Sequence, residues 1–350
     1  MSRAIAPSPA VRWMLALSAS LLTVGCPLFR GAVNASPGIR WWLFSHFGAE
    51  RMCPEMLKRS APLALAPGSA TQGRFFPSAC RSEVNDAQQT ITLRFAGTGY
   101  AWTPIAGKMG FSVSAGVEYR PDFEMTDDAV YVWARLSRVI DGPTFAIGSI
   151  ENPIADWAAR TPAGYLASTF GSQIVQSELA NGFTVIHTDQ GDDFSLGILR
   201  PPARPPHPFA LGGDDRISLA SETTDVRPGE VDFLGPFEVA KDDQALFARF
   251  RLNGPAVDVL VLQRGAGDPW REALQQGAPL GPPLSPPMTT FVVQPSVEQK
   301  QRLRLPRGQY YLVVDDSARV GVVAPPWSPM AALGAGTATL SYSVELGEAD

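Results

Sequence analysis

Histidine and cysteine are scarce in this chain, with three of each among 350 residues. A structural zinc site usually takes about four cysteine or histidine ligands, and the scattered His46, His187 and His207 do not supply such a set. The sequence also lacks the Gly-x-Ser-x-Gly nucleophile elbow, the His-Glu-x-x-His zinc helix and the glycine-rich phosphate loop ending in Lys-Ser or Lys-Thr. We therefore find no catalytic set, although a triad of His187 with distant serine and aspartate residues remains open.

Positive charge is neither abundant nor clustered, since 29 Lys and Arg residues stand against 34 Asp and Glu. Nucleic acid is excluded as an expected partner, because phosphate neutralisation supplies most non-specific affinity for DNA and RNA. Adjacent aspartates are expected at solvated loop ends. In one such segment Asp189, Asp192 and Asp193 are candidate Ca²⁺ ligands, since Ca²⁺ accepts carboxylate and backbone carbonyl oxygens. No other metal or cofactor is predicted.

Long apolar runs are absent beyond the N-terminus. Arg3 and Arg12 are the only charged residues before Cys26, and an apolar stretch occupies residues 13–24. A positive start followed by about a dozen apolar residues is typical of an export signal, and it is shorter than the roughly 20 residues of a membrane-spanning helix. We predict a signal peptide over residues 1–25.

Residues 22–26, Leu-Thr-Val-Gly-Cys, resemble the lipobox of bacterial lipoproteins. The resemblance implies cleavage before Cys26, attachment of a diacylglyceryl group to Cys26, and a membrane-anchored protein in the periplasm or on the cell surface. The alternative is free secretion, because Val33-Asn34-Ala35 has the small-residue pattern of ordinary secretory cleavage. Both alternatives place the protein outside the cytoplasm.

Two cysteines remain if Cys26 carries lipid. In an oxidising compartment Cys53 and Cys80 would then form a disulfide, which stabilises the fold by roughly 3–4 kcal/mol on the chain-entropy model. The alternative is two unpaired cysteines, with Cys53 buried as a small apolar residue.

The 32 glycines and 32 prolines favour short strands and turns over long helices. We predict a mostly β chain of two domains: an α+β or helix-decorated β-sandwich domain, then an antiparallel jelly-roll-like β-sandwich. The expected order is an anchor with an irregular or helical segment at 26–71, the first domain at 72–200 with one long helix near 155–179, a proline-rich linker at 201–229 and the sandwich at 230–347. Strands are expected at 129–138 and 144–150, among others.

The last part of the chain has the clearest strand patterns. Apolar and polar residues alternate over 337–346, as in a strand with one buried and one solvated face. Residues 248–252, 257–261, 308–314 and 336–342 together resemble the bacterial pre-peptidase C-terminal type of β-sandwich. That resemblance implies a small sandwich without catalytic residues, which assists secretion, folding or substrate attachment.

Aromatic residues are the remaining candidates for binding. Trp270 and Trp327 fall in predicted loops, where they would contact a ligand or, alternatively, plug the end of the sandwich. Residues 38–48 hold Trp41, Trp42, Phe44 and Phe47, which predicts a helix packed on the core or an aromatic face at the membrane interface.

The sequence thus predicts an exported, lipid-anchored cell-envelope protein with a non-catalytic binding or structural role. Its expected partners are the membrane and another envelope component, a protein or a polysaccharide. One alternative is an envelope or secreted hydrolase with the sandwich as accessory module. Another is a lipid-handling protein that packs the helix at 155–179 against a curved sheet around an apolar cavity.

Overall fold

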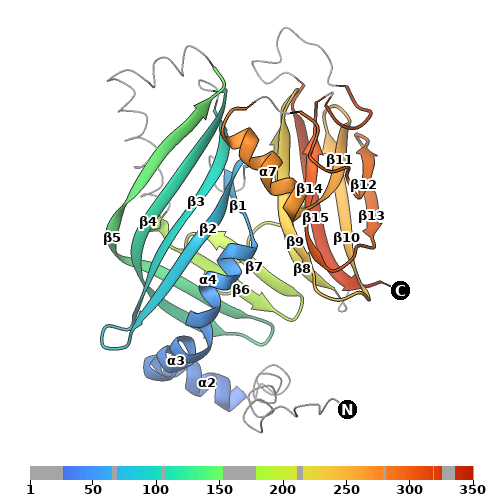
Figure 1. Ribbon diagram of the computed structural model, residues 1–350. Coiled ribbons are helices and arrows are strands. Elements are labelled where there is room, and N and C mark those ends of the chain that lie inside the picture. The colour runs from blue at the N-terminus through green and yellow to red at the C-terminus, as the bar shows by residue number, and fades with distance from the viewer. Residues whose placement is uncertain are drawn as a thin grey trace, which may run out of the picture.

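The structure is a computed structural model that describes residues 27–64, 69–103, 107–152, 179–210, 216–278, 281–317, 319–324 and 336–349. The expected signal peptide, Cys26, Trp327 and nearly all of the helix expected at 155–179 lie outside these residues. The described chain is mostly β, as predicted, and Figure 1 shows its N-terminal and C-terminal parts side by side.

The described chain begins with short helical segments. The sequence predicted an irregular or helical segment in this region. Ser36 caps the second of them, accepting the Ile39 N–H at 3.4 Å, and Pro37 fills the first turn, where a missing N–H costs little. The segments are α2 (Pro27–Ala35), α3 (Pro37–Leu43), η1 (Phe44–Gly48) and α4 (Ala49–Lys58), followed by the short strand β1 (Ala61–Ala64).

An antiparallel meander forms the N-terminal sheet. Its strands after β1 are β2 (Thr71–Asn85), β3 (Thr90–Thr103), β4 (Gly107–Met125), β5 (Val130–Ile150), β6 (Phe183–Thr188) and β7 (Gly191–Leu196). Side chains alternate between the two faces of β3, since Ile91 and Leu93 are buried, Thr92 between them is partly exposed, and Arg94 after them is exposed. The pairing register of β4 with β5 shifts at several points, and such bulges bend long strands.

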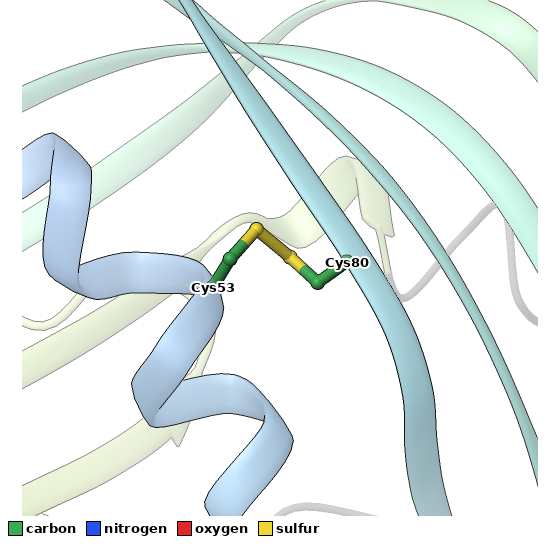
Figure 2. The surroundings of a disulfide bond; sticks show 2 residues. All are labelled: Cys53 and Cys80. Atoms are coloured by element: carbon green, nitrogen blue, oxygen red, sulfur yellow. A yellow bond between two sulfur atoms is a disulfide. The ribbon is translucent and has the colours of Figure 1, made fainter.

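Helix α4 is fastened to this sheet by a disulfide between Cys53 and Cys80 of β2, with a Cα–Cα distance of 5.3 Å (Figure 2). The predicted pairing is therefore confirmed. Around it, Phe44 and Ala49 pack against Ile91 and other buried residues of β3, β4 and β5. The helices thus cover one face of the sheet and bury its apolar side chains.

Two facing sheets form the C-terminal sandwich. One consists of β8 (Ile217–Val226), β15 (Ala338–Glu348), β10 (Gln244–Asn253) and β13 (Gln299–Leu303), which continue the N-terminal meander into one sheet of 11 strands. The other is a sheet of 4 strands: β12 (Thr289–Val293), β11 (Val257–Gln263), β14 (Gly308–Asp315) and β9 (Val231–Val239). Alternate side chains such as Leu340 and Tyr342 of β15 and Phe250 of β10 fill the space between the sheets.

Strand β8 lies within 201–229, which was expected to be a linker. It pairs antiparallel with β15 from Val226↔Ala338 to Ile217↔Leu346. Single residue pairs also join β8 to β7, through Gly191↔Ser218, and to β2, through Thr71↔Thr224. The sequence did not indicate this strand because many of its side chains are serine, threonine and acidic residues that hydrogen-bond rather than fill a core. As a result, β8 belongs to both parts of the molecule.

The two parts also share a hydrophobic cluster. The outer face of the β9, β11 and β14 sheet contributes Phe233 and Tyr311, helix α7 (Arg264–Gln275) contributes Trp270, and the N-terminal sheet contributes Phe76 and Tyr100. In Figure 1, α7 lies between the N-terminal sheet and the sandwich. Apolar burial therefore holds the two parts together at this junction.

A buried ionic network joins the same parts. The guanidinium of Arg74, which is 1% exposed, donates to Asp232 Oδ1 at 2.9 Å, to Glu222 Oε2 at 3.1 Å and to the Tyr342 hydroxyl at 3.1 Å. The Tyr100 hydroxyl donates to Asp232 at 2.6 Å. Because Arg74 comes from β2 and its partners from β8, β9 and β15, the network fixes how the N-terminal sheet meets the sandwich.

Candidate functional site

A cleft of about 690 Å³ lies between the N-terminal sheet and α7. One wall comes from β2, β3 and β4, with Phe76 and Thr98; the other comes from the polar face of α7, and Tyr311 and Arg59 complete the lining. A concave site at a domain junction, lined by a few polar groups beside aromatic rings, is the usual form of a ligand site.

Spacing along α7 explains why it presents two different faces. Gly267, Trp270 and Leu274 recur at helical intervals and pack on the sandwich, while Arg264 and Asp268 lie on the polar side. The sequence placed Trp270 in a loop, and that placement is wrong. Trp270 is 4% exposed, its ring centroid lies 5.5 Å from that of Phe233, and its Nε1 donates to the Gly281 carbonyl at 2.9 Å.

Asp268 is the centre of the polar wall. It accepts hydrogen bonds from the Tyr311 hydroxyl at 2.7 Å, from Arg264 Nε at 3.1 Å and from Arg271 at 3.3 Å. Burial raises the pKa of Tyr311, so its hydroxyl remains a donor at neutral pH. Charge-assisted contacts of this kind hold the side chains in one arrangement.

Arg271 links α7 to the opposite wall. Its guanidinium lies 4.3 Å from the centre of the Phe76 ring and donates to Gln275 Oε1 at 3.1 Å. The same Gln275 oxygen accepts from the Thr98 hydroxyl at 2.8 Å. A hydrogen bond between Thr98 and Gln275 therefore joins the two walls of the cleft.

The end of α7 approaches the sheet very closely at Gly110. A Cβ built on this glycine would lie 1.6 Å from the Gln275 carbonyl oxygen, and the Ser149 hydroxyl donates to that oxygen at 2.8 Å. Only glycine fits here without moving the helix. The position of α7, and with it the width of the cleft, depends on this residue.

The histidines do not line the cleft. His187 Nδ1 contacts Asp192 Oδ1 across the β6–β7 hairpin, and His207 Nε2 lies 3.1 Å from Asp193 Oδ2. The hydrogen bond to Asp192 is the largest influence on His187 and raises its pKa. Among the described residues, no histidine is hydrogen-bonded to both a carboxylate and a hydroxyl.

The calcium candidates are not brought together. Asp192 contacts His187 and Asp193 contacts His207, because neighbouring residues of a strand point to opposite faces. Asp189 takes part in neither of these contacts. Within the described ranges there is no group of three or more His, Cys, Asp or Glu side chains that could hold a metal ion.

A second set of carboxylates lies buried at one end of the sandwich, away from the cleft. Asp258 and Asp315 are opposite each other in the β11–β14 pairing, and with Asp316 they are 0% exposed. Burial raises the pKa of Asp315 to about 6; Ser317 and Arg319 lower that pKa and Asp258 raises it. Burial, and then the neighbouring Asp315, raises the pKa of Asp316 to about 6.

No protein-family model matches the chain, and no curated protein matches it. No helix in the described part of the chain has the length and apolarity needed to span a membrane. The functional argument therefore depends on the cleft and on the residues that build it. Sequence reasoning missed these residues, although the helical spacing of Gly267, Trp270 and Leu274 was a usable signal for α7.

Proposed function

We propose that the chain is an exported, lipid-anchored cell-envelope protein that binds another envelope component in the cleft between its two parts, without catalysing a reaction. The observation that carries the proposal is the cleft of about 690 Å³ whose polar wall is fixed by Asp268 and its three partners. A rigid wall with donors and acceptors in set positions favours selective binding.

The chemistry of the cleft favours a polar chain as ligand. Arg264 and Glu272 supply a donor group and an acceptor group at its rim, and Phe76 and Tyr311 supply aromatic surface. Mixed charge with aromatic rings suits the hydroxyls and amides of a polysaccharide or an extended peptide. A strongly charged ligand of one sign is disfavoured, because both signs line the site.

Export is supported by the disulfide. The bond between Cys53 and Cys80 forms and persists in oxidising compartments outside the cytoplasm. Lipid anchoring is supported by the lipobox-like residues 22–26. The lipid-handling alternative requires a continuous apolar cavity against the sheet, whereas Phe44, Ala49 and Cys53 cover that face among the described residues.

Site-directed photo-cross-linking tests the binding site. A benzoylphenylalanine at position 272, on the cleft rim, should cross-link an envelope component in intact cells. The same group at position 300, on the exposed edge strand β13, should not.

The cross-linked component, once identified and purified, should bind the wild-type protein. Arg264→Gln with Glu272→Gln should weaken that binding at least about tenfold, since two polar contacts are lost. The matched pair Glu298→Gln with Lys300→Gln, which lies outside the cleft, should leave it unchanged. Equal cross-linking at both positions, or equal affinity of both double variants, would refute the assignment of the cleft.

A further inference from the structure

The first helices of the described chain expose an unusual set of apolar side chains. Ile39, Trp42 and Phe47 are 42%, 51% and 53% exposed. The rings of His46 and Phe47 lie 4.9 Å and 5.8 Å from that of Trp42. We call Ile39, Trp42, His46 and Phe47 the aromatic patch.

The patch is held outward by its own helices. On the opposite side of α3, Arg40 Nε donates to Asp122 at 2.6 Å and Trp41 Nε1 donates to Asp86 at 3.0 Å. Phe44 is buried against the sheet. Because these neighbours face the sheet, Trp42 and Phe47 remain at the surface.

The position of the patch in the chain and in space identifies what covers it. Helix α2 begins at Pro27, the residue after Cys26, and Pro27 lies 15 residues before Trp42, so the start of α2 is roughly 25 Å or less from Trp42 along the helical segments. Figure 1 shows α2 and α3 at one end of the molecule, away from α7, whose residues line the cleft. An acyl group on Cys26 would therefore bring the membrane surface to the end of the molecule that exposes the patch.

We infer that the aromatic patch inserts into the headgroup region of the lipid bilayer and orients the anchored protein with its cleft away from the membrane. Tryptophan and phenylalanine next to apolar surface are the side chains that partition to this region. The inference deepens the proposed lipid anchoring and rests on it for the direction of the bilayer. It commits to lipid rather than to a protein partner, because the anchor itself brings lipid to this surface.

The test measures vesicle binding by the patch without the acyl group. The chain is exported behind a cleavable secretory signal with Cys26→Ser, so that its disulfide forms and no lipid is attached. It should co-sediment with vesicles of phosphatidylethanolamine and phosphatidylglycerol. Trp42→Ser with Phe47→Ser should lower the partition coefficient at least about tenfold, since each ring transfers about half of its surface into lipid.

A matched control removes equally exposed apolar side chains elsewhere. Leu284 and Met288 are 81% and 53% exposed, and Leu284→Ser with Met288→Ser should leave vesicle binding unchanged. Absence of binding by the chain with an intact patch, or equal losses in the two double variants, would overturn the inference.

A second variant covers the case in which the double substitution prevents folding. Brominated lipids should quench tryptophan fluorescence of the chain with an intact patch, and Trp42→Phe should remove most of that quenching while binding stays within about twofold. Unchanged quenching would overturn the inference. The anchor is tested separately by the intact mass of the protein recovered from membranes, where a missing acyl mass refutes anchoring whatever the vesicles show.

Discussion

Replacing Asp315 with asparagine should stabilise the protein most strongly at neutral pH. Asp315 is fully buried opposite Asp258, and its pKa is raised from 3.8 to about 6. A raised pKa in the folded state means that stability is present below the unfolded pKa and is lost as pH rises through the folded pKa. The contribution of Asp315 to stability is therefore lost as pH rises between about pH 4 and pH 6, whereas asparagine, which resembles the protonated acid, shows no such loss.

The size of the effect follows from the two pKa values. A pKa raised from 3.8 to about 6 corresponds to about 3 kcal/mol at pH 7.5 and about 1 kcal/mol at pH 4.5, because pH 4.5 lies only slightly above the unfolded pKa. Urea unfolding of wild-type and Asp315→Asn proteins at both pH values measures this difference. The exposed Asp243→Asn is the control. A gain that is equal at the two pH values, or equal to that of the control, would contradict the reasoning.

Other substitutions test the junction. Arg74→Met should cost about 3–5 kcal/mol in urea unfolding, because it leaves carboxylates buried without their cation; an effect below about 1 kcal/mol would contradict this. Cys53→Ser with Cys80→Ser should lower the free energy of unfolding by roughly 3–4 kcal/mol, and reduction of the wild-type protein should match it. Gly110→Ala should displace α7 and speed limited proteolysis near Gln275, whereas normal protease resistance would show that the helix tolerates a Cβ.

The alternation of apolar and polar residues predicted the strands that have one buried face. It failed for strands whose sequence does not alternate. The alternation of β15 could be recognised in the sequence because its apolar residues, among them Leu340 and Tyr342, are those that face the core of the sandwich. Strand β5 is continuous, although the sequence predicted a break near Gly142 and Pro143. The described pairing of β5 with β6 covers only Val130 to Ala134. Pro143 therefore needs no backbone N–H to donate a hydrogen bond to β6.

The candidate site could not be predicted because its contacts join distant parts of the chain. In the cleft, Thr98 and Gln275 are 177 residues apart, and in the ionic network of the junction Arg74 and Asp232 are 158 apart. Neither pair has a local pattern that would connect its members. Pro269 and the glycines of α7 favoured a loop over a helix in the sequence, although Trp270 and Leu274 are spaced as on one face of a helix. The disulfide was predictable because counting leaves only one pair once Cys26 is set aside.

Sharing β8 between the two parts has a consequence for how a ligand reaches the cleft. The strand pairs with β15 in the sandwich and touches β2 and β7 of the other sheet, so hinge opening would have to separate backbone pairs at Thr71 and Gly191. If the cleft binds a ligand as proposed, we expect the site to be preorganised and the ligand to enter without a closing motion. Binding should then be fast and lose little free energy to reordering of the protein, while ligands wider than the fixed gap are rejected at the entrance.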